Sequence, residues 1–189
     1  MEQFYLEVPS LEREDDAIDY INEFIDNHSS IHGSGELQNY LDNYPKWINK
    51  LADDKKIINW VFLVNTETYF LVRNSDNKIV GMCNLRLELT KVLEKSAGHI
   101  GYGIRPSERR KGYSKILLYL SLKKCLEHGI EEVYIFCDNT NIYSRKTILS
   151  FGGIYQTSYE REDRIDEKYI IPVKEALEKN KEIYEALCI

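Results

Sequence analysis

The chain has 189 residues, of which 43% are hydrophobic and 30% are charged, and its formal net charge at pH 7 is -6. This length and composition predict one globular domain, residues 1–189, with a single core, and they exclude a largely disordered chain. The acidic balance argues against nucleic acid as a partner, and the lack of any run of about 20 apolar residues argues against a membrane partner.

The N-terminal segment is acidic and has neither a basic start nor an apolar stretch, so it does not resemble a signal peptide and a cytoplasmic protein is expected. Apolar residues from Leu11 to His28 recur at helical spacing and predict an amphipathic helix. Small and turn-forming residues from Ser29 to Gly35 predict a loop. A second helix is expected from Leu37, and Pro45 is expected to end or kink it before the apolar face resumes.

Strand-favouring residues dominate the middle of the chain. The runs of this character are Tyr69–Arg73, Ile79–Leu85, His99–Ile104 and Val133–Cys137. The first two flank the turn-forming residues 74–77 and predict a hairpin. Between the last two, the apolar spacing from Tyr113 to His128 predicts a helix that Gly129 closes.

The C-terminal part alternates between helix and strand. The expected elements are a short helix Asn141–Ser150, strands Gly153–Tyr159 and Lys168–Val173, and a last helix over residues 174–189. Strand–helix alternation implies right-handed crossovers between neighbouring parallel strands, and the earlier hairpin makes the sheet mixed. We therefore predict an α/β fold with a central mixed sheet and flanking helices. The last helix can pack on its own sheet or on a second copy, so a monomer and a homodimer both stay open.

The cysteines lack the paired spacing of a zinc site or a redox motif. They are Cys83, Cys125, Cys137 and Cys188. We expect reduced, mostly buried thiols and no metal site.

The segment Gly101–Ser114 runs from a predicted strand through a basic loop into a predicted helix. The first amides of a helix have no intrahelical partners and point outward, so a bound phosphate would satisfy them. Gly112 lets the backbone approach a ligand closely. The basic residues Arg109, Arg110 and Lys111 add positive charge. The segment predicts an anion site, and a solvated basic turn is the alternative.

Arg109, Gly112 and Ser114 resemble the acetyl-CoA loop of the GNAT superfamily of N-acetyltransferases. That pattern is Gln or Arg, two residues, Gly, one residue, then Gly or Ala, and Ser114 departs from it while remaining small. Later in the chain, Asn141 and Ser144 match an asparagine and a small residue that face the cofactor in that family. Without the family, Asn141 is a helix N-cap and Ser144 an early-turn residue. The resemblance extends from about residue 69 to residue 173.

The resemblance implies a GNAT fold whose two central parallel strands, here His99–Ile104 and Val133–Cys137, splay apart around the cofactor. It implies acetyl-CoA (coenzyme A) as co-substrate, no metal, and direct attack of an amine on the thioester. The amide of Ile104 is expected to contact the thioester and the oxyanion. The residues assigned to the cofactor are Ile104, Arg109, Arg110, Lys111, Gly112, Tyr113, Ser114, Asn141 and Ser144.

The candidate catalytic groups are Tyr143, His99 and Glu88. Many family members protonate the leaving thiolate with a tyrosine seven residues after the asparagine, where this chain has Ile148. Tyr143 is a possible substitute, and packing is the alternative for this residue. His99 is a candidate base because histidine titrates near neutrality, with Glu88 as a rival and a structural role for His99 as the alternative.

By resemblance, residues 1–60 form a helical segment on the acceptor side, 69–173 form the sheet and acetyl-CoA core, and 174–189 form the C-terminal helix. Ser29–Glu36, with His32, is expected near the acceptor, an amine of a small molecule or a peptide. The predicted function is an acetyl-CoA-dependent N-acetyltransferase. The alternatives are a catalytically silent acyl-CoA-binding module and a nucleotide-binding protein that uses the same loop.

Overall fold

The computed structural model describes residues 2–56 and 63–189. The part of the predicted helical segment 1–60 that falls on residue 1 and residues 57–60 lies outside the described residues. Within the described ranges, no helix combines the length and the apolar character needed to cross a bilayer.

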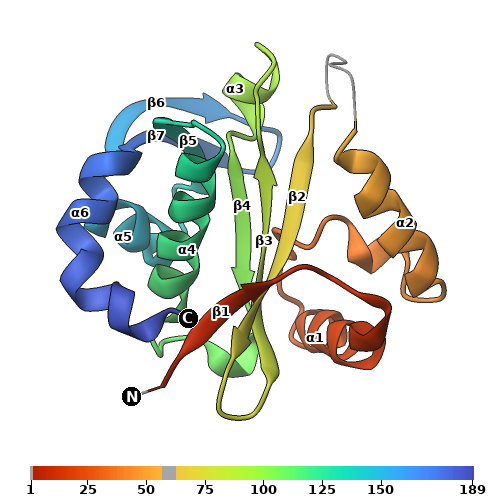
Figure 1. Ribbon diagram of the computed structural model, residues 1–189. Helices are drawn as coiled ribbons and strands as arrows, with labels where there is room; N and C mark the ends of the chain where they lie inside the picture. Colours follow the sequence, from red (N-terminus) through yellow and green to blue (C-terminus); the bar gives the residue numbers. More distant parts are fainter. Residues whose placement is uncertain (1, 57–62) are drawn as a thin grey trace.

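The strands form two antiparallel sheets (Figure 1). The four-stranded sheet contains, in spatial order, β1 (Phe4–Glu7), β2 (Thr66–Arg73), β3 (Lys78–Arg86) and β4 (Ile100–Ile104). The three-stranded sheet contains, in spatial order, β5 (Glu132–Asp138), β7 (Ile165–Pro172) and β6 (Ile154–Glu160). The predicted hairpin is confirmed, because β2 and β3 pair antiparallel along their whole length.

Helices cover both faces of the four-stranded sheet (Figure 1). The helices of the fold are α1 (Glu14–Asp26), α2 (Tyr44–Asp54), α3 (Leu93–Ser96), α4 (Tyr113–Glu127), α5 (Ile142–Ser150) and α6 (Val173–Tyr184), of which α1 and α2 lie on one face of this sheet and α4 on the other. Side chains of strands alternate between faces, so the sheet separates two apolar cores, and the prediction of a single core is wrong. Phe70 and Val72 pack with α1 and α2 in one core, and Leu71 and Val80 pack with α4 and α6 in the other.

The expectation that Pro45 ends or kinks a helix begun at Leu37 is wrong. Leu37–Asn39 form only a short 3₁₀ turn, and α2 begins at Tyr44 with Pro45 in its first turn. Proline fits there because the first helical N–H groups have no intrahelical acceptor, and its ring fixes a helical φ. Asn43 caps the helix, since its Oδ1 accepts from the Lys46 amide at 3.1 Å.

Strand β1 was not predicted. Its pattern is hard to detect because Phe4 is its one fully buried side chain. The strand pairs antiparallel with β2, and the Ile189 amide at the other end of the chain donates to the Phe4 carbonyl at 3.0 Å. The two termini therefore lie close together beside α4 (Figure 1).

The strands β4 and β5 meet at one point and then belong to separate sheets. The His99 amide donates to the Tyr134 carbonyl at 2.7 Å, and the Tyr134 amide donates to His99 Nδ1 at 3.0 Å. The Tyr134 N–H thus bonds to the imidazole and not to a backbone carbonyl. Gly98, with φ of 67°, permits this approach, because an added Cβ would collide with the Tyr134 carbonyl. The expected parallel neighbours are splayed and do not form a continuous ladder.

Candidate functional site

The outer edge of β4 presents free backbone groups toward the gap between the two sheets. The Arg105 amide donates to the Val80 carbonyl of β3 at 2.9 Å. Because N–H groups alternate along an antiparallel strand, the amides of Ile104 and Tyr102 point away from β3. The amide of Ile104, the group expected to contact the thioester, thus points toward the gap, and Tyr102 offers a second amide on the same edge.

The loop after β4 forms the predicted helix N-terminus. Arg110 and Gly112 have positive φ, 63° and 85°, a conformation found where successive N–H groups converge on an anion. Gly112 caps α4, which begins at Tyr113. In the described residues, the Lys115 amide is the first of this turn with a backbone partner, the Gly112 carbonyl at 3.0 Å. The amides of Gly112, Tyr113 and Ser114 precede it, so the turn retains the donors that an anion requires.

The basic side chains of the loop are held in three different ways. Arg109 turns toward α1, where its Nε donates to the Ile104 carbonyl at 3.2 Å and its Nη2 donates to Ser29 Oγ at 2.7 Å. Lys111 Nζ pairs with Glu108 at 2.8 Å. The Arg110 guanidinium lies 5.7 Å from the centroid of the Tyr143 ring. Arg110 and Lys111 remain exposed near the α4 N-terminus, whereas Arg109 positions the loop against the neighbouring elements.

The second predicted motif lies opposite this loop on α5. Asn141 caps the helix, since its Oδ1 accepts from the Ser144 amide at 3.0 Å. Thr147 donates to the Tyr143 carbonyl at 3.0 Å, so in its 3.2 Å contact with Thr147 the hydroxyl of Ser114 acts as donor. The Ser114 hydroxyl is therefore already engaged, and its backbone amide is the group left for an anion.

Tyr102 was not identified by the sequence analysis, although it lies within the informative segment. Its hydroxyl is 3.3 Å from Ser144 Oγ, so its side chain connects β4 with α5 across the gap. Burial raises the pKa of Tyr102 to about 12. The sequence signal that could have identified Tyr102 is its position between Gly101 and Gly103. These two glycines make Tyr102 the one residue with a side chain among three successive strand positions.

His99 lies at the joined end of β4 and β5 and is 8% exposed. Its Nδ1 accepts from the Tyr134 amide, so the neutral ring carries its proton on Nε2. Burial, assisted by the positive charge of Arg86, lowers the pKa of His99 to about 4. Of the two roles that the sequence left open, these contacts favour the structural one.

We predict that His99 titrates near pH 4 when its ring protons are followed by NMR. Its folded-state pKa lies below the unfolded value of about 6.5, so its stabilising contribution is present above pH 6.5 and declines as the pH falls toward 4. The free energy of unfolding that His99 contributes should fall by about 3 kcal/mol over this pH range. Urea unfolding measures this loss, which should be absent from the His99→Asn variant. Titration of His99 near pH 6.5 would contradict this assignment.

The other two catalytic candidates lie at opposite ends of β4. Glu88 follows the end of β3 that pairs with the start of β4, beside His99. Glu88 is therefore at the end of β4 away from Ile104. Tyr143 is 59% exposed and stacks beneath Arg110, near the loop. Ile148 is fully buried, so no hydroxyl comes from that position of α5. Roles for Glu88 and Tyr143 in catalysis stay predictions.

The predicted acceptor loop lies against the opposite face of β4. An added Cβ on Gly103 would come within 2.9 Å of the His32 carbonyl, and one on Gly33 within 2.6 Å of the Gly101 carbonyl. Tyr20 of α1 donates to the Gly103 carbonyl at 3.0 Å. The glycines of β4 thus allow the loop to pack directly on the strand backbone, which places His32 beside the gap on the side away from α5.

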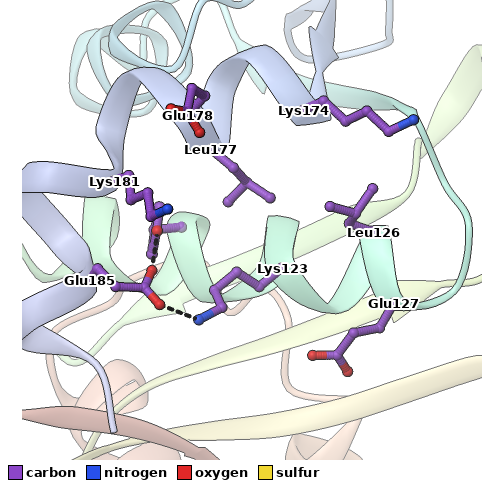
Figure 2. A pocket seen from close by; sticks show the side chains of 9 residues that line it. Lys123, Leu126, Glu127, Lys174, Leu177, Glu178, Lys181 and Glu185 are labelled. Atoms are coloured by element: carbon purple, nitrogen blue, oxygen red, sulfur yellow. Dashed lines mark hydrogen bonds and ion pairs between the residues drawn. The ribbon is translucent and has the colours of Figure 1, made fainter.

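A separate hollow of about 520 Å³ lies between α4 and α6 (Figure 2). Leu126 and Leu177 form its floor, and the Lys123–Glu185 ion pair at 3.1 Å crosses its rim. It contains none of the residues assigned to the cofactor, so it is distinct from the candidate site. In the ranges 2–56 and 63–189, no group of three or more histidine, cysteine or acidic side chains is arranged to hold a metal ion.

The chain is an α/β protein with a GNAT fold, and it belongs to the acetyltransferase (GNAT) family, whose profile matches residues 36–152. No curated protein sequence matches it.

Solved structures share the fold at low sequence identity. RimJ from Mycobacterium smegmatis, in complex with CoA-disulfide, has a TM-score of 0.70 at 13% identity, covering 94% of this chain and 87% of its own. The spermidine/spermine N-acetyltransferase SpeG from Vibrio cholerae has a TM-score of 0.66 at 13% identity, covering 94% and 98%. The microcin C7 self-immunity acetyltransferase MccE, in complex with acetyl-CoA and AMP, has a TM-score of 0.63 at 15% identity, covering 89% and 91%.

Proposed function

We propose that this protein is an acetyl-CoA-dependent N-acetyltransferase that acts on an amine of a small molecule or a peptide. The observation that carries the proposal is the presence of two neighbouring sets of backbone N–H donors that have no backbone partner in the described residues. The amides of Gly112, Tyr113 and Ser114 open α4, and those of Tyr102 and Ile104 face the gap where β4 leaves β5. A pyrophosphate with a peptide-like arm fits this combination, because both parts of such a ligand seek N–H donors.

Each group of residues at the site has a separate role in the proposed reaction. The α4 amides, with Arg110 and Lys111, bind the phosphates, and the edge of β4 orients the thioester. An N–H donor on that edge stabilises the oxyanion that forms when the amine attacks, because a fixed donor needs no reorganisation. The attack is direct and needs no nucleophilic side chain. The acceptor enters beside His32, from the face opposite α5.

A catalytically silent acyl-CoA-binding module is the second candidate. It is supported by two observations, the buried Ile148 at the position of the family's usual acid and the engagement of His99 with Tyr134. The two candidates share the cofactor site and differ in turnover.

Calorimetry with acetyl-CoA, followed by a thiol-release screen over amines that includes polyamines and peptide N-termini, separates the candidates. The enzyme proposal expects binding and release of free thiol with at least one amine class. Binding without thiol release across the panel would support the silent module. A protein that binds no acetyl-CoA at millimolar concentration would refute both.

We predict that the double variant Arg110→Ala/Lys111→Ala binds coenzyme A about 10-fold more weakly, because two exposed cations near a bound phosphate contribute about 1–2 kcal/mol together. A pantetheine thioester without phosphates should bind the variant and the wild type equally. Calorimetry at low and moderate salt measures both ligands. Equal losses for the two ligands would show that these side chains do not contact phosphate.

A further inference from the structure

The hollow between α4 and α6 carries charges of both signs around an apolar floor (Figure 2). The floor is formed by Leu126 of α4 and Leu177 of α6, which are both half-buried. The charged residues that line the hollow are lysines and glutamates in equal number, Lys123, Lys174, Lys181, Glu127, Glu178 and Glu185. A ligand of one charge sign would meet as many like charges as opposite ones. The lining therefore fits a partner surface that also carries both signs.

Four of these charges alternate in sign along one side of α6. They are Lys174, Glu178, Lys181 and Glu185, the last in the turn that directly continues the helix. Steps of three and four residues keep side chains on the same side of a helix. About the midpoint between residues 179 and 180, each lysine has a glutamate at the same distance on the other side. The stripe thus changes sign when the helix is reversed.

A helix with this pattern is complementary to a second copy of itself in the antiparallel arrangement. A two-fold axis through the midpoint places Lys174 opposite the partner subunit's Glu185, and Glu178 opposite the partner subunit's Lys181. The symmetry makes each of these pairs occur twice. A parallel arrangement would instead place every charge opposite its own copy. The charges therefore select a second copy of this chain and one direction for its helix.

The charges at the centre of the stripe have no competing ion pair. Within residues 2–56 and 63–189, neither Glu178 nor Lys181 lies within 4.0 Å of an oppositely charged group. The charges at its two ends take part in exposed ion pairs, Lys174–Glu131 and Lys123–Glu185. Exposed pairs of this kind contribute little to stability, so a partner subunit can share or replace them.

We propose that the hollow between α4 and α6 is the interface of a homodimer, in which α6 pairs antiparallel with the α6 of a second copy. The inner face of α6 packs on its own core through Ala176 and Leu177. Leu177 lies within one helical turn of the midpoint, so the partner's helix covers the apolar floor. On α4 the lining begins at Tyr119, which leaves the loop around Gly112 outside the interface. Because exposed ion pairs form much of the contact, the dimer is weak and sensitive to salt.

The test is sedimentation velocity of the whole chain over a concentration series from about 10 µM to about 1 mM. The wild type should dimerise in low salt, and its dissociation constant should rise about 10-fold in about 0.5 M salt. Lys181→Glu and Glu178→Lys each place like charges opposite one another twice, so each variant alone should be monomeric. An equimolar mixture of the two should dimerise again, because the glutamates of one chain at these positions then face the lysines of the other.

Lys179→Glu is the matched control. It makes the same change of charge on the same helix, at an exposed lysine that does not line the hollow, and it should dimerise like the wild type. Circular dichroism of each variant checks that a lost dimer is not a lost fold. The double variant Glu178→Lys/Lys181→Glu restores opposite charges within one sequence and should dimerise with itself.

Dimers of the wild type, the control and the mixture, with monomers of the two single variants, support the interface. A wild type that stays monomeric at the highest concentration overturns it. A dimer that survives Lys181→Glu also overturns it, since the contact would then use another surface. The same holds if neither the mixture nor the double variant dimerises. No acyl donor enters these experiments, so their outcome is independent of the proposed function.

Discussion

Replacing Gly112 with tryptophan is expected to raise the dissociation constant for coenzyme A by about 10- to 100-fold. Gly112 caps α4 with φ of 85°, and an added Cβ meets no atom within 4 Å, so the new side chain projects into the space before the helix. It would displace a phosphate from at least one amide, and a hydrogen bond to a charged group contributes about 1.5–3 kcal/mol. Isothermal calorimetry measures the loss.

Gly129→Trp is the control for this experiment. Gly129 ends the same helix with φ of 76°, and an added Cβ there also meets no atom within 4 Å. Both variants carry the cost of a side chain in the left-handed region, about 1–2 kcal/mol, so both should melt at similarly lowered temperatures. Only Gly112→Trp should lose coenzyme A. Normal affinity in Gly112→Trp, or equal losses in both, would place the phosphates elsewhere.

The elements that the sequence predicted correctly depend on local patterns. Apolar spacing defines α4, and turn residues define the β2–β3 hairpin, so both could be found from neighbouring residues alone. Pro45 was misinterpreted because the same residue ends one helix or begins another, and the choice depends on whether Asn43 caps the following turn. Strand β1 was missed because its pairing with β2 joins residues nearly seventy positions apart.

In the candidate site, too, the features that depend on local sequence could be predicted and those that depend on long-range contacts could not. The loop around Gly112 and the cap at Asn141 are local features, and their geometry is as their residue types indicate. The splayed strands could be predicted only through the family resemblance, because β4 and β5 touch at a contact between His99 and Tyr134, which are far apart in the sequence. The reach of Tyr102 to Ser144 depends on how two sheets meet, and no spacing in the sequence encodes that.

Glu108 shows how a long-range contact fixes the cofactor loop. This carboxylate is 4% exposed and accepts from Arg73 of β2 at 2.8 Å and from Lys111 at 2.8 Å. Arg73 also donates to the Tyr113 hydroxyl at 3.3 Å. One guanidinium thus holds residues on both sides of Gly112, and the loop is positioned before any ligand arrives. The loop is preorganised from the hairpin and does not depend on its own sequence alone.

We therefore predict that Glu108→Gln lowers the free energy of unfolding by about 1–2 kcal/mol at pH 7, because Lys111 loses its partner while Arg73 keeps only its ion pair with the more exposed Asp76. Burial alone would raise the pKa of Glu108, but hydrogen bonds from Lys111 and Arg73 outweigh it and hold this pKa below its usual range. The folded-state pKa is lower than the unfolded one, so the stabilisation is present near neutrality and is lost as the pH falls through the folded value. Urea unfolding at several pH values measures it.

The difference in the free energy of unfolding between wild type and Glu108→Gln should therefore shrink as the solution is acidified. Coenzyme A should bind the variant more weakly than the wild type at pH 7. Glu131→Gln is the matched control, since Glu131 pairs with Lys174 on an exposed surface and should unfold like the wild type. A Glu108→Gln protein as stable as Glu131→Gln would mean that the ion pairs only neutralise the cost of burying the carboxylate. A stable variant that also kept its coenzyme A affinity would remove Glu108 from the account of how the loop is held.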